Sequence, residues 1–378
     1  MKEKQKSPMT KKSKIVIAIV VVLLLVLIVV FRDRLLRLDE PTGRIDVHEH
    51  SVVQLPPAYD HGDNPIQIQD VVLYDLSGSN ERFTERNIAW SYAGEGNGLS
   101  PEIEFATVTP GVDLISDVLI HDSYLEFVPV SDQGRGTAVI TITIGQHSRT
   151  MFVKLYDLSL RLIALEFDDG PSRYTRDIVE SLNNSGVSAS FYVTGRMFHD
   201  IAHEYVGVEV YPELALFAFA SGHHIGNHTF SHPWIVAYSG DFHQAFPPGQ
   251  YRPWWEYSEE EVIWQVKQAD EAIYRTLGFI PNYYAPPYYF EGHNETILAL
   301  GKTLSSRFYA IDIGDWHPET TKEDIIERVL SAPNNSTVVL HDVYQKTAEA
   351  IEYIMNSSRA LEIQFVTGYE LDMILGRE

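Results

Sequence analysis

Residues 162–171 read LIALEFDDGP, a short apolar run that ends in two acidic residues and a Gly-Pro turn. A run of this kind, bounded by turn residues, is typical of a buried strand, which we expect over residues 162–167. After it the sequence predicts a helix over 174–185, a strand over 189–193 and a later strand over 337–340. Strands that alternate with helices predict an α/β fold with a parallel sheet, open or closed into a barrel.

Two further helices carry recognisable start signals. Ser258, with Glu261 three residues later, predicts a capping box that opens a helix, and Gly278 is expected to end this helix. Thr321 and Asp324 repeat the same arrangement. Both helices fit the strand–helix alternation of this part of the chain.

The adjacent carboxylates Asp168 and Asp169 follow the first predicted strand. Like charges side by side are costly unless a cation shares them, and functional groups of α/β folds collect at the carboxyl ends of strands. A metal ion would supply the required charge. The sequence Asp-Asp-Gly is also an ordinary turn, so the motif alone leaves both interpretations open.

Residues 222–233, GHHIGNHTFSHP, hold four of the 15 histidines of the chain. The spacing of four between His228 and His232 is expected to bring both imidazoles to one side of a single turn. Two imidazoles and a carboxylate form the usual open zinc site. His223 and His224 are expected to have structural roles.

The predicted strand 337–340 ends at His341. A lone histidine at a strand end is more often a structural residue than a catalyst. However, Asp315, in the sequence DIGDW, offers a carboxylate that can fix the imidazole tautomer and raise its pKa, as a general acid requires. We therefore expect His341 and Asp315 to form a pair.

Residues 67–157 show a different pattern, in which short β-prone runs are separated by turns. Residues 137–144 alternate apolar with mostly polar side chains, as in a half-buried strand. About seven such strands predict an all-β sandwich, with a loose resemblance to bacterial immunoglobulin-like modules. A spacer, a wall-binding module and plain structural support are all consistent with this pattern.

The amino end predicts a membrane anchor. Residues 15–31 are apolar and uncharged, a length at the low end for crossing a bilayer. The basic residues of 1–14 place the amino end in the cytoplasm, and residues 32–66 form a linker to an extracellular portion. The alternative is a helix buried in a protein core.

Composition excludes several classes of function. The formal charge of −23 has the wrong sign for coating a nucleic-acid backbone, so nucleic acid is excluded as a partner. With no cysteine, the chain has neither disulfides, thiol nucleophiles nor Cys-ligated metals. Any metal is therefore held by histidine and carboxylate side chains. The oligomeric state does not follow from the sequence.

Together with YAPPY at 284–288, these motifs resemble, in content and order, the NodB-homology polysaccharide deacetylases of carbohydrate esterase family 4. The resemblance covers about residues 160–375. It implies that residues 158–378 form a distorted (β/α) barrel of about seven strands, and the patterns described above place an all-β sandwich and one transmembrane helix before this barrel. It also implies hydrolysis of N-acetyl groups on an amino-sugar polymer.

The resemblance assigns a role to each motif. It implies that Asp169, His228 and His232 hold a divalent metal, most often Zn²⁺ with Co²⁺ or Mn²⁺ as alternatives. It implies that Asp168 is the general base and that His341, tethered by Asp315, is the general acid. The implied pocket for the acetyl group is formed by Tyr288, Trp316, Leu340 and Pro287, with the backbone N–H of Tyr288 as oxyanion donor.

Some positions depart from the family pattern. Ala285 stands where the family usually has an arginine that balances the charge of the catalytic aspartate, and Arg173 and Arg307 are the candidates to replace it. Glu166 stands where a small hydroxyl residue is common. The segment 236–257, which contains Trp254 and Trp255, is expected to form either a groove wall or part of the core.

The sequence thus predicts an anchored, extracellular, metal-dependent polysaccharide N-deacetylase. N-acetylglucosamine of peptidoglycan is the leading substrate, with chitin-like oligomers, poly-N-acetylglucosamine and acetylated xylan as alternatives. A second hypothesis is a catalytically weakened glycan-binding or scaffold protein on the same barrel, which Ala285 favours. A third is an amidohydrolase that acts on a small non-sugar substrate.

Overall fold

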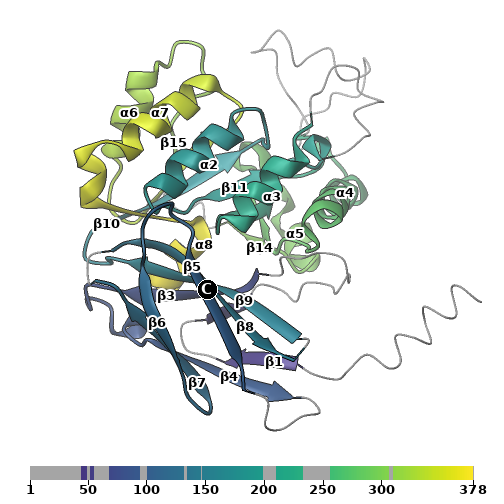
Figure 1. Cartoon of the computed structure of the whole chain (residues 1–378). Helices are drawn as coiled ribbons and strands as arrows, with labels where there is room; N and C mark the ends of the chain where they lie inside the picture. Colours follow the sequence, from purple (N-terminus) through teal and green to yellow (C-terminus); the bar gives the residue numbers. More distant parts are fainter. Residues whose placement is uncertain are drawn as a thin grey trace, which may run out of the picture. The chain divides into compact units, whose positions relative to one another are not determined.

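The computed structural model describes residues 44–48, 52–54, 68–93, 100–131, 134–145, 147–198, 210–232, 256–305 and 310–377 (Figure 1). The chain divides into two units: residues 1–46 with 92–99, and residues 47–91 with 100–378. Only residues 44–46 and 92–93 of the first unit are described. The candidate site lies in the second unit.

The amino-terminal half of the described chain is built of strands. They are β1 (Arg44–His48), β2 (Val52–Gln54), β3 (Ile68–Asp75), β4 (Asn87–Ala93), β5 (Glu102–Thr107), β6 (Ile115–Ile120), β7 (Tyr124–Pro129), β8 (Gly136–Ile144) and β9 (His147–Tyr156), with a 3₁₀ turn at Glu81–Phe83. One sheet has the order β2-β3-β9-β8-β5, and in another β7 lies between β4 and β6. The short strands predicted for residues 67–157 are thus present.

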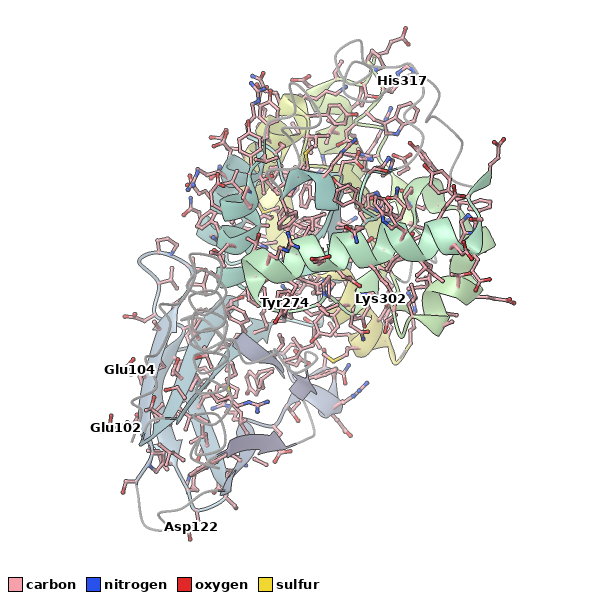
Figure 2. The ribbon with its side chains drawn as sticks, turned by 90° about the vertical axis from the view of Figure 1, so that its right-hand side faces the viewer. Glu102, Glu104, Asp122, Tyr274, Lys302 and His317 are labelled. Atoms are coloured by element: carbon pink, nitrogen blue, oxygen red, sulfur yellow. The ribbon has the colours of Figure 1, made fainter. Side chains whose placement is uncertain are left out.

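Strand β8 shows why this segment forms strands. Ala138, Ile140 and Ile142 are fully buried, whereas Thr141 and Thr143 on the other face are only partly covered. The neighbouring strand β5 exposes Glu102 and Glu104, which Figure 2 shows at the edge of the β-rich part. The alternation predicted for residues 137–144 is confirmed.

The carboxyl-terminal half contains a sheet in which every pairing is parallel. Its strands are β10 (Arg161–Asp168), β11 (Ser190–Val193), β12 (His224–Asn227), β13 (Tyr283–Tyr284), β14 (Thr303–Leu304), β15 (Ala310–Asp312), β16 (Ser336–His341) and β17 (Ile363–Val366). The order is β14-β13-β12-β11-β10-β16-β15, and β17 pairs with the first half of β10. The expected parallel sheet is present, but it has eight strands rather than about seven.

The parallel sheet remains open between its two edge strands. In the part of the chain that the structure describes, no pairing joins β14 to β15. The sheet is therefore consistent with a distorted (β/α) barrel that is not closed by hydrogen bonds.

Helices accompany this sheet (Figure 1). They are α2 (Thr175–Asn184), α3 (Pro212–Ala220), α4 (Glu259–Leu277), α5 (Asn294–Ala299), α6 (Lys322–Leu330), α7 (Gln345–Met355) and α8 (Gly368–Leu375), with 3₁₀ turns at Gly195–Met197, Pro287–Tyr289, Glu291–His293 and Ser358–Glu362. Neighbours contact each other in the order α6, α7, α2, α3, α4, α5. Both predicted capping boxes are present, and Gly278 ends α4 in the left-handed conformation.

No helix among the described residues is long and apolar enough to cross a membrane. The predicted anchor at 15–31 and the tail at 1–14 lie outside the described residues, as does most of the predicted linker.

The register of the sheet aligns the strand ends that carry polar residues. Asp168 at the end of β10 is the Cα partner of His341 at the end of β16 and of Tyr192 in β11. Val193 of β11 pairs in turn with Asn227 at the end of β12. Because the strands are parallel, the residues that follow β10, β11, β12 and β16 gather at one edge of the sheet.

Candidate metal centre and active site

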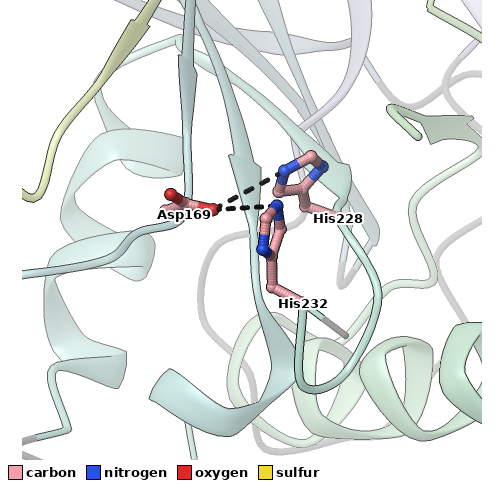
Figure 3. Close-up of side chains that lie close together, drawn as sticks. All are labelled: Asp169, His228 and His232. Atoms are coloured by element: carbon pink, nitrogen blue, oxygen red, sulfur yellow. Dashed lines mark ion pairs between the residues drawn. The ribbon is translucent and has the colours of Figure 1, made fainter. Parts of the chain in front are cut away.

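Asp169 is the first residue after β10, and it adopts a positive φ of 76°. Its Oδ1 is buried and accepts no hydrogen bond from the described residues. This atom lies 3.6 Å from Nε2 of His228 and 3.4 Å from Nε2 of His232 (Figure 3). A buried carboxylate oxygen that faces two imidazole nitrogens is suited to a shared cation.

The two histidines meet through an irregular loop. Residues 228–232 follow β12 and are not helical, and both Thr229 (φ 69°) and His232 (φ 48°) have left-handed backbone conformations. The expectation that a spacing of four acts through a single regular turn is therefore wrong. The imidazoles still converge, with their ring centroids 4.8 Å apart.

Each imidazole is held through its other ring nitrogen. Nδ1 of His228 lies 2.8 Å from the carbonyl oxygen of Ala285, which accepts only, so Nδ1 donates this hydrogen bond and Nε2 is the nitrogen that remains for a metal. Nδ1 of His232 lies 3.2 Å from the hydroxyl of Tyr288. Such partners fix the ring orientation of metal-ligating histidines.

Asn227 anchors the loop that carries these histidines. Its Oδ1 accepts a hydrogen bond from the Thr229 backbone N–H at 2.8 Å, and its Nδ2 donates to the Val266 carbonyl and to Asp270 in α4. Lys302, seen beside α4 in Figure 2, donates to the same Asp270 oxygen at 2.6 Å. The loop is therefore fixed to α4 by a polar network.

Protonation states in the cluster suit metal binding. Burial would raise the pKa of Asp169, but the nearby His232, His341, His228 and Arg196 lower it below its ordinary value. Burial lowers the pKa of His232 to about 3, although Asp169 opposes this effect. The carboxylate is thus ionised and the imidazole of His232 neutral at neutral pH, as ligation requires.

The ligand atoms of Asp169, His228 and His232 all lie within 4.8 Å of one another. Together with the unpartnered Oδ1 of Asp169, this nitrogen and oxygen donor set fits a divalent cation such as Zn²⁺. The three predicted metal ligands are therefore brought together.

Asp168 lies beside this cluster. It is almost fully buried at the end of β10, and its Oδ2 is 3.6 Å from Nε2 of His228. The two adjacent carboxylates thus both face the imidazole of His228.

His341 and Asp315 form the expected pair. Nδ1 of His341 lies 2.7 Å from Oδ1 of Asp315, and the backbone N–H of His341 donates to Oδ2 at 2.8 Å. The hydroxyl of Thr347 also donates to Oδ2, at 2.6 Å. Burial alone would lower the pKa of His341, but Asp315, with Asp169 and Asp168, raises it to about 10.

The residues expected to line the acetyl pocket differ in exposure. Trp316 is 40% exposed, and its Nε1 donates to the carboxylate of Asp312 at 3.1 Å. Tyr288 is 39% exposed and has a positive φ of 58°. Leu340 and Pro287 are buried, Leu340 within the main hydrophobic core. Their contribution to a pocket stays a prediction.

His223 and His224 have the structural surroundings expected for them. The Ala189 backbone N–H donates to Nδ1 of His223, and Nδ1 of His224 lies 3.2 Å from the hydroxyl of Ser190. Burial, together with the charge of Lys154, lowers the pKa of both imidazoles to about 3. Both are therefore neutral.

Sequence reasoning did not single out Arg196, which acts on the site, whereas the candidates Arg173 and Arg307 stay predictions. The guanidinium of Arg173 lies over the ring of Tyr174, and Arg307 is outside the described residues, as are Trp254 and Trp255. The arginine whose charge acts on Asp169 is Arg196. Its position three residues after the predicted strand end at residue 193 was the available signal.

Other residues near the site were also missed. They are Thr347, which binds Asp315; Tyr344, whose ring centroid lies 6.0 Å from that of His341; and Asp342 with Thr175. Thr175 begins α2 and Thr347 lies in the first turn of α7, and nothing in their local sequence distinguishes them. Only the tertiary structure brings them to this edge of the sheet.

Comparison with known families agrees with this geometry. Residues 156–308 match the polysaccharide deacetylase family. This match supports a NodB-type polysaccharide deacetylase domain in the chain, as the motifs predict, and we call it the deacetylase domain. The matched residues include Asp169, His228 and His232, whereas Asp315 and His341 lie beyond them.

Curated relatives resemble the deacetylase domain at low identity. The chain is 27% identical over 220 residues to the peptidoglycan-N-acetylmuramic acid deacetylase PdaC of Bacillus subtilis (strain 168), across 58% of this chain and 40% of that protein. It is 25% identical over 210 residues to the peptidoglycan-N-acetylglucosamine deacetylase PgdA of Listeria monocytogenes serotype 1/2a (strain 10403S), across 55% of this chain and 38% of that protein. The chain thus spans 40% or less of the length of these relatives.

A solved structure of peptidoglycan deacetylase PdaC from Bacillus subtilis is also similar. It is 25% identical, with a TM-score of 0.46, over 58% of this chain and 94% of that chain.

Proposed function

We propose that this protein is a metal-dependent hydrolase that removes N-acetyl groups from an amino-sugar polymer. One observation carries the proposal: the ligand atoms of Asp169, His228 and His232 lie within 4.8 Å of one another at the sheet edge where Asp168 and His341 also end their strands. This arrangement supplies a cation site and two proton carriers. An amide hydrolase needs all three.

Asp169, His228 and His232 would hold the metal, which supplies Lewis-acid polarisation of the amide carbonyl and activates a water molecule. Asp168, next to this site, accepts the proton of the attacking water. Its burial keeps bulk water from competing for that proton. The adjacent ligand Asp169 leaves Asp168 available for this step.

His341 donates a proton to the departing amine nitrogen. Because Nδ1 is engaged by Asp315, Nε2 is the nitrogen available for transfer. The raised pKa keeps the imidazole protonated near neutral pH. Without this proton, the tetrahedral intermediate would return to the amide rather than release the amine.

Trp316 and Tyr288 supply exposed aromatic surface for the sugar, and Pro287 and Leu340 close the apolar side around the acetyl methyl group. The backbone N–H of Tyr288 is the oxyanion donor in this proposal. Tyr288 and the following Tyr289 both have left-handed backbone conformations.

We propose peptidoglycan N-acetylglucosamine as the substrate. Support comes from the relatives, two of which are named as peptidoglycan deacetylases, one for each amino sugar. Support also comes from the apolar segment 15–31, which would anchor the protein and place the deacetylase domain at the outer face of the membrane. There it meets the cell wall first.

Two features of the site favour catalysis over a purely glycan-binding role. A binding protein needs neither a buried carboxylate oxygen without a hydrogen bond beside two imidazoles nor a third imidazole that is paired with Asp315. Both features are costly unless they serve chemistry. The arrangement therefore supports an active enzyme despite Ala285.

The test is acetate release from purified wall glycan and from a chitooligosaccharide, with the Asp168→Asn variant beside the wild type. We expect loss of at least about 10²-fold in rate, since general-base catalysis contributes that much. Asp122→Asn, at an exposed position far along the chain from the site, is the matched control and should keep full activity. Equal acetate release by wild type and Asp168→Asn would contradict the proposal.

A further inference from the structure

A short segment of the chain is tied to both loops that carry the candidate metal ligands. After β11, the Thr194 hydroxyl donates to the carbonyl of Asp169 at 3.1 Å, and its N–H donates to the carbonyl of Gly170. The next N–H groups, of Gly195 and Arg196, donate to the carbonyls of Thr229 and Phe230 at 3.0 and 2.8 Å. Residues 194–196 therefore bridge the Asp169 loop and the histidine loop.

Packing leaves this bridge little room to move. A Cβ on Gly195 would lie 2.7 Å from the ring of Phe230 and 2.8 Å from the Cα of Ala269 in α4. Only glycine fits there, and its backbone is clamped between the histidine loop and α4. The backbone of Arg196 is thus fixed relative to the metal ligands.

The side chain of Arg196 is 7% exposed. A buried guanidinium is strongly destabilising unless an anion compensates it. Burial lowers the pKa of Arg196, whereas Asp169 and, to a smaller extent, Tyr288 raise it. The compensating carboxylate is therefore the metal ligand Asp169.

Arg196 also acts on other parts of the site. Its charge contributes to the lowered pKa of His232 and opposes the raised pKa of Tyr288, the residue whose hydroxyl contacts His232. One buried cation is thus coupled to a ligand carboxylate, a ligand imidazole and the residue that orients that imidazole.

We propose that Arg196 is the positioning residue of the metal centre: its buried guanidinium balances the carboxylate of Asp169 and limits how much charge Asp169 gives to a bound metal. This inference rests on the proposed function for its catalytic consequence. Arg196 acts through Asp169 and Tyr288 and does not touch the substrate. The fully buried Ala285 supplies no charge.

The charge of Arg196 is expected to lower the affinity of the site for a metal while it promotes catalysis. A cation beside the ligands repels the metal and draws electron density from Asp169, which keeps the metal a strong Lewis acid. Removal of this charge should make the site bind Zn²⁺ more tightly while it catalyses less well. A residue that only supports the fold would lose both properties together.

The experiment compares wild type with Arg196→Met, which removes the charge, and Arg196→Lys, which keeps it. Arg176→Met is the matched control, because Arg176 is exposed on α2 and pairs with Glu180 there. Zn²⁺ affinity is measured by competition with a chromophoric chelator, in the absence of substrate, and kcat/KM by acetate release from a chitooligosaccharide. If Arg196→Met does not fold, Arg196→Gln takes its place as the neutral variant.

We expect Arg196→Met to bind Zn²⁺ about 3- to 10-fold more tightly, with kcat/KM at least about 10-fold lower. Arg196→Lys should stay within about 3-fold of wild type in Zn²⁺ affinity. Weaker or unchanged Zn²⁺ binding by the neutral variant would overturn the proposal. The affinity measurement needs no catalysis, so it tests Arg196 even if the deacetylase function itself were wrong.

Discussion

Asp315 contacts His341 at two points, through Oδ1 to the imidazole Nδ1 at 2.7 Å and through Oδ2 to the backbone N–H at 2.8 Å. The ring is therefore held both by its side chain and by its own backbone. Because Asp315 is fully buried, this carboxylate has no exchange with bulk water. The contact fixes which nitrogen can transfer a proton.

Asp315→Asn is expected to lower kcat by about 10²- to 10⁴-fold, the range that general acid catalysis supplies. Asp315 opposes the effect of burial and raises the pKa of His341, so its loss should lower that pKa. The alkaline limb of the kcat/KM profile should then move to lower pH. An unshifted limb would show that His341 is not the titrating acid.

Asp342 is expected to make the stability of the metal-free protein depend on pH. Its carboxylate lies against Gly170, where a methyl group would come within 2.2 Å of its oxygens. Oδ2 accepts a hydrogen bond from Thr175, whereas Oδ1 has no hydrogen-bond partner among the described residues. Burial raises its pKa from 3.8 to about 7.

Since the folded-state pKa of Asp342 lies above the unfolded one, its stabilising contribution is complete below about pH 4 and is lost as the pH rises toward 7. The loss amounts to about 4 kcal/mol at most. Asp342→Asn keeps the Thr175 contact and removes the charge. Urea unfolding at pH 4.5 and 7.5 should show a smaller drop for this variant than for wild type or Asp122→Asn, and an identical drop would contradict this account.

Trp316→Ala is expected to weaken substrate binding more than chemistry. Asp312 holds the exposed indole of Trp316 in place. An aromatic ring exposed in this way is suited to stacking on a sugar ring. KM for a chitooligosaccharide should rise about 5-fold with kcat changed by less than about 3-fold, as for loss of about 1 kcal/mol of stacking energy. Trp316→Phe should recover most of the affinity. A fall in kcat with unchanged KM would instead place Trp316 close to the reacting atoms.

The sequence predicted those features that depend on local burial and capping. The alternation of residues 137–144 and the helix start at Ser258 follow from side chains that act within a few residues. The strand β6 (Ile115–Ile120) has only two buried side chains, so its sequence pattern is a weak signal.

The sequence predicted which residues form the site but not the backbone conformation that brings them together. His228 and His232 converge through two left-handed residues that the spacing did not reveal. The approach of Arg196 to Asp169 depends on bridging hydrogen bonds between loops far apart in the chain, as does the contact between Thr347 and Asp315. Such contacts are set by the tertiary structure and leave no local pattern.

The central claim is that one carboxylate and two imidazoles hold the metal. X-ray absorption at the zinc edge of the Zn²⁺-loaded protein tests it most directly, with His232→Ala for comparison and His121→Ala, in the β-rich part, as control. We predict a first shell of two imidazole nitrogens with oxygen ligands at about 2.0–2.1 Å, and the loss of one imidazole in His232→Ala alone. A shell without two imidazoles, or one unchanged in His232→Ala, would contradict the account.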